Sequence, residues 1–183
     1  SKFLKCGGCD FRHVNNNWIQ SWKINQLKQK TKLLVNPNKI FPIAVSDNHS
    51  RRRATFSATY NNKKLFLGFK SKFSTRIVNL DTCKTLEKEL IRIYLFLREN
   101  LGSVIKTNFK FAIHINLLDK GSDIVFNLEK NSYDKIFEID NLINLLTSAK
   151  ILRISFKEKS GFVTIPLQSE IKNELGKLNN KTI

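Results

Sequence analysis

Residues 54–70 read ATFSATYNNKKLFLGFK, and this stretch decides the fold that the sequence predicts. Two runs rich in β-branched and aromatic residues, 54–60 and 64–70, flank the Asn-Asn pair at 61–62. Asparagine tolerates a positive φ, so the pattern is typical of a β-hairpin joined by a tight turn. We expect residues 75–80 to add a third strand.

Helices and hairpins alternate through the rest of the chain. Residues 84–101 carry leucine and isoleucine at steps of three and four, which predicts an amphipathic helix that Gly102 ends. The elements expected after it are a hairpin (110–117 and 123–129), a helix (133–146), a third strand pair (151–156 and 161–165) and a C-terminal helix (168–178). The predicted fold class is α+β, with a mainly antiparallel sheet of hairpins and helices packed on one face.

A further helix is expected ahead of this sheet, from Trp18 to about Leu34. Its apolar residues fall near one side, lysines fill the remainder, and Asn36-Pro37 ends it. The sequence therefore predicts a basic amphipathic helix close to the N-terminus.

Positive charge is distributed unevenly along the 183 residues, whose net charge is +17. Residues 1–80 contain 16 basic and 2 acidic side chains, whereas residues 81–183 contain 16 and 13. Basic side chains on phosphates release condensed counterions, so the excess favours a nucleic-acid partner. An AT-rich genome would also raise lysine and asparagine content, but such drift alone should not segregate charge by position.

The basic residues expected to contact RNA phosphates lie on and beside the first hairpin. They are Arg51, Arg52, Arg53, Lys63, Lys64, Lys70, Lys72 and Arg76. Guanidinium groups suit phosphate because their planar donors can bind two oxygens at once. The alternative is a merely solvated loop. Phe66, Phe69 and Phe73 could stack on bases, but strand alternation predicts that most of them lie in the core.

Cys6, Cys9 and Cys83 are the candidate metal ligands. The Cys-Gly-Gly-Cys turn puts two thiolates within reach of one metal centre, and its glycines let the backbone bend so that amides face the sulfurs. Tetrahedral zinc and cubane iron–sulfur clusters both take four ligands. An odd number of cysteines argues against a secreted disulfide framework, which leaves zinc, iron–sulfur, a redox dithiol and coincidence open.

Length and composition set further limits. A chain of 183 residues with 41% hydrophobic content can bury one core and gives no sign of disorder. No apolar run approaches the roughly 20 residues that span a bilayer, and the first 15 residues lack the apolar core of a signal peptide. We expect a cytoplasmic monomer without membrane contact. The chain has no methionine, so we also expect it to be a piece of a longer protein.

Several motifs together resemble one enzyme family. They are Cys6-Gly7-Gly8-Cys9-Asp10-Phe11-Arg12-His13, Arg51-Arg52-Arg53-Ala54-Thr55-Phe56, Leu67-Gly68-Phe69, and Ile77-Val78-Asn79-Leu80-Asp81 ahead of Cys83. This set resembles the RNA uracil-C5 methyltransferases, which modify ribosomal and transfer RNA. In that family a Cys-x5-Cys-x2-Cys run and a distant fourth cysteine hold a four-iron, four-sulfur cluster.

The resemblance implies that all three cysteines of this chain are cluster ligands. The family spacing would place the remaining cysteine one residue before Ser1, so a cluster held by three thiolates would be labile. Arg12 stands where the family usually has glutamine, and His13 is therefore expected to pack or hydrogen-bond rather than to bind metal.

The resemblance also implies an enzyme whose catalytic part is absent from this chain. Methylation at uracil C5 needs a cysteine nucleophile, a carboxylate base and a glycine-rich turn for S-adenosylmethionine. The three cysteines are already assigned to the cluster and no Gly-x-Gly occurs, so we expect no catalytic and no S-adenosylmethionine-binding residue here. The cofactor would bind only to the full-length enzyme.

The expected domain organisation follows from this resemblance. Residues 1–35 would carry the cluster motif and basic helix, residues 36–166 would form a central α+β RNA-binding domain, and residues 167–183 would lead to a missing methyltransferase domain. The expected role is to fold the substrate RNA and present a uridine. The alternatives are a free-standing RNA- or zinc-binding module and the inactive remnant of a split gene.

Overall fold

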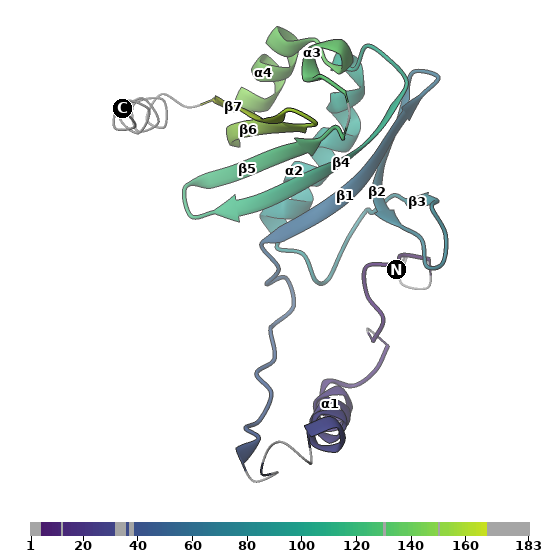
Figure 1. Cartoon of the computed structure of the whole chain (residues 1–183), viewed down its shortest axis with the longest axis vertical. Coiled ribbons are helices and arrows are strands. Elements are labelled where there is room, and N and C mark those ends of the chain that lie inside the picture. The colour runs from purple at the N-terminus through teal and green to yellow at the C-terminus, as the bar shows by residue number, and fades with distance from the viewer. Residues whose placement is uncertain are drawn as a thin grey trace.

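A seven-stranded mixed sheet forms the body of the protein (Figure 1). The computed structural model describes residues 5–11, 13–31, 36, 39–129, 131–149 and 151–167. The strands are β1 (Arg53–Asn61), β2 (Lys64–Lys70), β3 (Ile77–Val78), β4 (Phe109–Leu118), β5 (Gly121–Asn127), β6 (Ile151–Glu158) and β7 (Gly161–Pro166), in the order β3-β2-β1-β4-β5-β6-β7. The helices are α1 (Asn16–Thr31), α2 (Lys88–Asn100), α3 (Tyr133–Ile136), α4 (Ile139–Thr147) and the 3-10 helix η2 (Leu101–Val104). The predicted α+β class is confirmed.

The first hairpin is confirmed, but its turn lies one residue later than expected. Asn61 pairs with Lys64, so the two-residue loop is Asn62-Lys63, with φ of 49° and 59°. These left-handed values belong to the primed turns that match strand twist. The register pairs Ala58 with Leu67, which buries both, and this burial rather than the Asn-Asn pair fixes the position of the loop.

All neighbouring strands pair antiparallel except β5 and β6, which are parallel. A parallel pair needs a crossover connection, and α3 and α4 provide it. The single helix expected over residues 133–146 is therefore two helices, because Phe137 is extended and forms an antiparallel bridge with Ile105. Phe137 is fully buried, so its packing outweighs the continuation of the helix.

The helix α2 begins at Lys88, later than expected, and Gly102 does not end it. The segment ahead of α2 is held extended by a parallel bridge between Arg51 and Leu86, and the Glu87 N–H donates to the Arg51 carbonyl at 3.0 Å. After Asn100 the chain tightens directly into η2, which contains Gly102.

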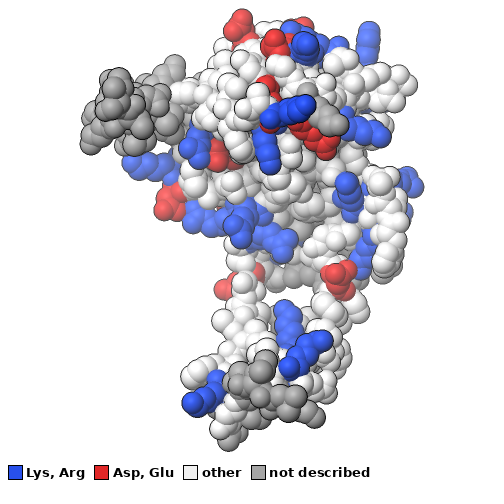
Figure 2. Space-filling view, viewed as in Figure 1, with Lys and Arg blue, Asp and Glu red and all other residues white. Residues whose placement is uncertain are grey.

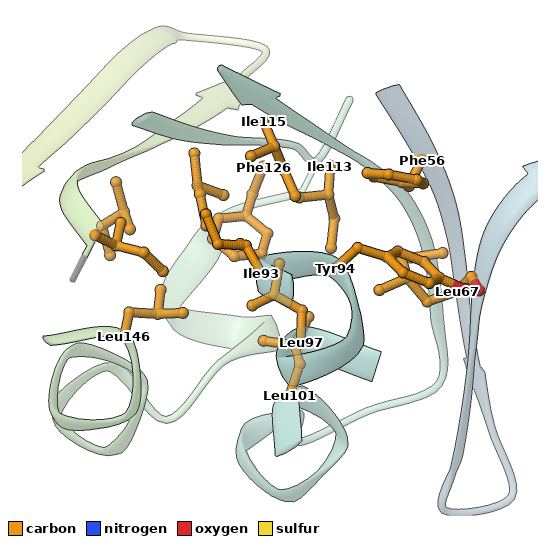
Figure 3. Packing of buried hydrophobic residues seen from close by; sticks show 14 of the residues in the cluster. Phe56, Leu67, Ile93, Tyr94, Leu97, Leu101, Ile113, Ile115, Phe126 and Leu146 are labelled. Carbon is orange, nitrogen blue, oxygen red and sulfur yellow. Dashed lines mark hydrogen bonds between the residues drawn. The ribbon is translucent and has the colours of Figure 1, made fainter. Parts of the chain in front are cut away.

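Strand alternation gives the sheet one apolar and one polar face. The apolar face packs on α2, α4 and η2, as Figure 3 shows. The side chains labelled there are Phe56, Leu67, Ile93, Tyr94, Leu97, Leu101, Ile113, Ile115, Phe126 and Leu146. Full burial of one such leucine, isoleucine or phenylalanine contributes about 1.5–3 kcal/mol of transfer free energy. Among the described elements, no helix covers the other face, which we call the helix-free face, and its residues decide the functional site.

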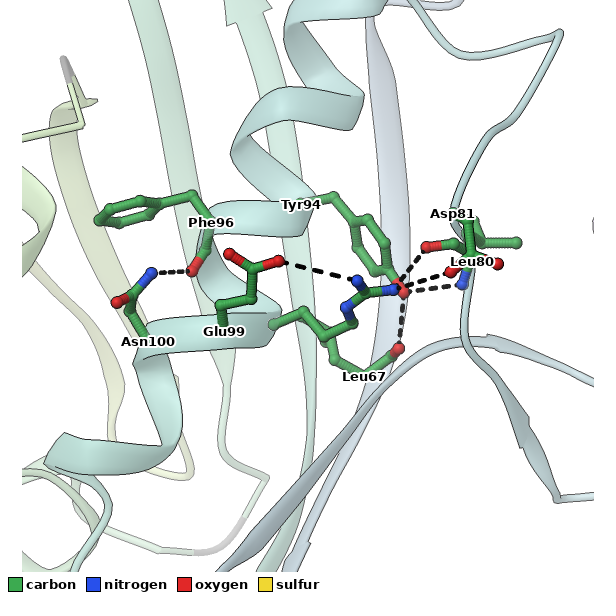
Figure 4. Close-up of polar contacts among 8 residues, drawn as sticks. Leu67, Leu80, Asp81, Tyr94, Phe96, Glu99 and Asn100 are labelled. Atoms are coloured by element: carbon green, nitrogen blue, oxygen red, sulfur yellow. Dashed lines mark hydrogen bonds and ion pairs between the residues drawn. The ribbon is translucent and has the colours of Figure 1, made fainter.

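Tyr94 of α2 joins the helix to the sheet edge (Figure 4). Its buried hydroxyl donates to the Leu67 carbonyl at 2.8 Å and accepts the Leu80 N–H at 2.9 Å. Burial is the main cause that raises the pKa of Tyr94, while the Leu80 amide and nearby Arg98 act in the opposite direction. Arg98 in turn donates to the Leu80 carbonyl at 2.8 Å, so the segment after β3 is fixed to α2 by polar contacts.

The helix α1 lies away from the sheet (Figure 1), and none of its residues is buried. Its predicted existence is confirmed, but its apolar residues do not pack on the core. Instead Trp22 contacts Phe11 and Trp18, with ring centroids 5.2 and 6.2 Å apart. The expected helix over residues 168–178 lies outside the described residues. Within the described part, none of the helices has the length and apolar character needed to cross a membrane.

Candidate functional site

The Cys-Gly-Gly-Cys loop docks on the end of β2. Cys6 forms an antiparallel bridge with Ser71, and the Gly7 N–H donates to the Lys70 carbonyl at 2.9 Å. A Cβ at Gly7 would lie 2.8 Å from that same carbonyl oxygen, so this position requires glycine for close approach. The loop is thus an extension of the sheet edge.

The structure brings the three thiols to one region. The Gly8 N–H faces the Cys6 sulfur at 3.4 Å, and the Cys9 sulfur lies 3.5 Å from the Thr85 hydroxyl, two residues from Cys83. Burial raises the pKa of Cys6 most, the Gly8 hydrogen bond lowers it, and the charges of Cys9 and Cys83 raise it further. The contact between Cys9 and Thr85 therefore places the segment that carries Cys83 beside the N-terminal loop.

The three thiols nevertheless do not form a ready chelate. Among the described residues, no group of three or more His, Cys, Asp or Glu side chains is arranged to hold a metal ion. His13 is exposed in the turn ahead of α1. The donor set, three cysteine sulfurs with a backbone amide aimed at one of them, suits zinc or an iron–sulfur cluster in kind but falls short of the usual four ligands.

The arginine run divides between the two faces of the sheet. Arg51 and Arg53 line a groove on the helix-free face, whereas Arg52 points to the other side and forms a 2.7 Å ion pair with Asp119. This division follows from the period of two along a strand. Only two of the three guanidiniums can therefore act at one site.

The groove has a volume of about 680 Å³ and crosses the middle of the helix-free face. Besides the two arginines, its polar lining comes from Thr55, His114, Asn116 and Lys157, and Phe162 forms an aromatic wall. No acidic side chain is among the lining residues. In Figure 2, Lys and Arg side chains gather over the start of β1 on this face.

His114, at the centre of the groove, has a protonation state that depends on its burial and its neighbours. The Thr55 hydroxyl and His114 Nδ1 are 2.8 Å apart. Burial, followed by the charge of Lys157, lowers the pKa of His114. The imidazole is therefore held neutral at neutral pH.

Sequence reasoning missed His114, Asn116, Lys157 and Phe162. Polar residues at every second position of the predicted strands were the available signal. They could not be grouped without the register, which aligns Arg53 with Asn116 and Lys157 with Phe162.

The other predicted basic residues occupy two separate places. Lys70, Lys72 and Arg76 lie near the cysteine loop: the Lys72 N–H donates to the Lys5 carbonyl at 3.3 Å, and the Arg76 carbonyl accepts the Ser71 N–H at 2.7 Å. The Lys72 ammonium also pairs with Asp10 at 3.5 Å. Lys63 and Lys64 lie at the opposite end of the hairpin, roughly 27 Å along β1 by strand rise. The predicted basic residues therefore do not form one patch.

The expectation that most of the three nearby phenylalanines lie in the core is wrong. Phe69 stacks on Phe56 with centroids 4.9 Å apart, but Phe66 is 46% exposed and Phe73 is fully exposed. Phe66 alternates with buried Leu67 and so faces away from α2, and Phe73 stands in the turn after β2 with a φ of 56°.

Comparison with known proteins finds similar RNA methyltransferases. The 23S rRNA (uracil(1939)-C(5))-methyltransferase of Marinomonas sp. (strain MWYL1) is 27% identical over 137 residues, which cover 73% of this chain and 30% of the relative. The corresponding enzyme of Marinomonas posidonica is 29% identical over 131 residues, covering 70% and 30%. Over about 70% of its length the chain is similar to RNA uracil-C5 methyltransferases. It spans about a third of the length of these curated relatives.

A solved structure supports the fold. The crystal structure of Pyrococcus abyssi tRNA (uracil-54, C5)-methyltransferase in complex with S-adenosyl-L-homocysteine matches with a TM-score of 0.52 and 18% identity. The match covers 85% of this chain and 37% of that structure. No family model matches the chain.

Proposed function

We propose that this chain supplies the cysteine motif and the RNA-binding part of an S-adenosylmethionine-dependent RNA (uracil-5-)-methyltransferase. In this proposal residues 1–35 carry the cysteine motif and the basic helix, residues 36–166 bind RNA, and residues 167–183 lead toward a catalytic domain. In this proposal, no residue of this chain takes part in methyl transfer or binds S-adenosylmethionine. Its part is to hold the RNA substrate.

One observation carries the proposal: Thr85 connects the cysteine loop to the arginine groove. Its hydroxyl contacts the Cys9 sulfur at 3.5 Å, and its carbonyl accepts the Arg51 N–H at 3.1 Å. Whatever holds the three sulfurs together would therefore also fix the backbone from which Arg51 projects. A metal-binding motif and a phosphate-binding surface next to each other suit an RNA-modifying enzyme better than either feature alone.

The proposed ligands of a four-iron, four-sulfur cluster are Cys6, Cys9 and Cys83. Such a cluster, when bound, would tie the N-terminal loop to the segment ahead of α2. The Gly8 amide, which already points at the Cys6 sulfur, would stabilise negative charge on that sulfur. The chain's own contribution is three thiolates and this hydrogen bond.

Reconstitution with iron and sulfide under anaerobic conditions tests the cysteine assignment. We expect the wild-type chain to bind iron and acid-labile sulfide, and the Cys83→Ala variant to lose most of both, because one of three sulfurs is removed. Thr85→Ala is the matched control, since it removes a contact of Cys9 but no sulfur. Stoichiometric zinc in aerobically purified protein, with no uptake of iron and sulfide, would instead support a zinc module. Equal iron in the wild type and in Cys83→Ala would refute the assignment.

A further inference from the structure

We propose that the groove on the helix-free face binds single-stranded RNA, with phosphates at Arg51 and Arg53 and a base stacked on Phe162 beside Lys157. This inference rests on the proposed function and names the surface that would perform it.

The register of the sheet places the groove residues in ordered rows. Arg53 is level with Asn116 of β4 and Thr55 with His114, while Lys157 of β6 is level with Phe162 of β7. Lys157 lies in the row of Ser57, which is two residues along β1 from Thr55. Neighbouring strands are about 4.8 Å apart, so β1 and β6 are separated by about 14 Å. The groove therefore runs diagonally across the strands, with guanidiniums at one end and an aromatic ring at the other.

The charged side chains that line the groove favour an anionic ligand. Arg51, Arg53 and Lys157 all line it. The nearest carboxylate in the same rows is Asp123, level with both Asn116 and Arg153, and it is buried and bound by Arg153 at 2.8 and 3.3 Å. The guanidinium of Arg153 offsets the charge of this carboxylate. The charged side chains that line the groove are therefore all cationic.

The aromatic residue favours a nucleic acid over other anions. Phe162 is 64% exposed, and the Lys157 ammonium lies 5.9 Å from its ring centroid. An exposed phenylalanine has no role in the core, whereas a base can stack on its ring whatever its sequence. An aromatic ring on an open sheet face next to cations is a known way to bind unpaired bases.

Single-stranded RNA fits better than a duplex because of the shape of the site. Bases reach the Phe162 ring only when they are unpaired, and the bases of a duplex remain stacked inside it. The Thr55 hydroxyl, the Asn116 amide and His114 offer hydrogen bonds within the groove, which suit the hydroxyls and base edges of an exposed strand.

Two adjacent arginines supply a matched test. Arg53→Ala removes a charge inside the groove, and Arg52→Ala removes the same charge on the opposite face, where Asp119 holds it. Binding of the full chain to a labelled oligouridylate would be measured by fluorescence anisotropy at several salt concentrations. We expect Arg53→Ala to lower the slope of log affinity against log salt by about 0.7, and Arg52→Ala to change it much less.

The aromatic end is tested separately. We expect Phe162→Ala to weaken binding by about 5- to 150-fold, with Phe73→Ala, at an exposed ring outside the groove, as the control. Equal effects of Arg52→Ala and Arg53→Ala, or wild-type affinity in Phe162→Ala, would overturn the inference. Competition by polyglutamate as strong as by oligouridylate would also overturn it, because the occupant would then be an acidic protein surface.

The experiments distinguish a failure of the RNA-binding groove from a failure of the proposed function. If the wild-type chain binds oligouridylate and only Lys70→Ala or Lys72→Ala weakens binding, the groove is not the site but the proposed function stands. If the wild-type chain does not bind RNA at all, both proposals fail.

Discussion

His114 shows how a single residue is set by the face of the sheet on which it lies. It alternates with buried Ile113 and Ile115 and so points away from α2, toward Thr55 and Lys157. Partial burial and the lysine charge both disfavour its protonation. A titrating group is thereby held in its neutral form at the centre of a cationic groove.

The lowered pKa of His114 predicts a pH dependence of stability. The unfolded state binds the proton with a pKa of about 6.5, above that of the folded state. The unfolded chain therefore takes up more protons as pH falls through this value, and the free energy of unfolding decreases. We expect His114→Gln to reduce this decrease between about pH 7.5 and pH 5.5 in urea unfolding. Identical pH profiles for the wild type and the variant would contradict the assignment.

At the scale of elements, the short β3 lies beside β2 and approaches its backbone closely. Phe69 pairs with Val78, and a Cβ at Gly68 would lie only 2.1 Å from the Val78 carbonyl oxygen. The close approach also lets Leu80, two residues after Val78, reach the Tyr94 hydroxyl. Glycine in the Leu67-Gly68-Phe69 motif therefore has a packing reason, which is independent of RNA.

The close approach of Val78 to Gly68 predicts that one added methyl group at residue 68 lowers the free energy of unfolding strongly. Gly68→Ala should destabilise the fold by about 1–3 kcal/mol or more, because backbone must move to admit the side chain. Gly102→Ala is the control: its Cβ would meet nothing nearer than 3.5 Å, and its change in unfolding free energy should stay within about 1 kcal/mol. Both values come from denaturant unfolding. A Gly68→Ala variant as stable as Gly102→Ala would show that β3 does not pack in this way.

Much of the element pattern could be predicted, because it depends on local periodicity. The strand over 64–70 was predicted with its observed bounds, since two hydrophobic runs flank a polar turn. The break between α3 and α4 could not be, because it depends on a bridge from Phe137 to distant Ile105. The groove likewise needed the register of β1, β4 and β6, and the role of Cys83 was suggested only by a family resemblance.

At the scale of the whole molecule, the described chain has a body built on one core and an arm outside it. The body is the sheet with α2, α3, α4 and η2, which share one hydrophobic core. The arm is α1, which buries none of its residues. Isolated helices of this length are marginal in water, so the two parts should differ greatly in local stability.

Hydrogen exchange would measure this difference. We expect the amides of α1 to exchange with little protection and those of α2 to exchange only through global unfolding, because Leu90, Ile93 and Leu97 are buried. Trp22→Ala should leave the exchange of α2 unchanged, while Leu97→Ala should speed it, at a cost of about 2–5 kcal/mol. Protection of α1 equal to that of α2 would mean that the helix is packed on the body in solution.

The contacts of Thr85 have a consequence for how this protein can be rebuilt. Cys9 and Arg51 both meet that one residue, so the two ends of the segment between them lie close together on the body. The segment between Cys9 and Arg51 is therefore an insertion whose two ends lie next to each other. Closure entropy changes only by about 0.6 kcal/mol for each doubling of loop length, so this insert can be lengthened, shortened or exchanged for another sequence while the strands keep their order and pairing.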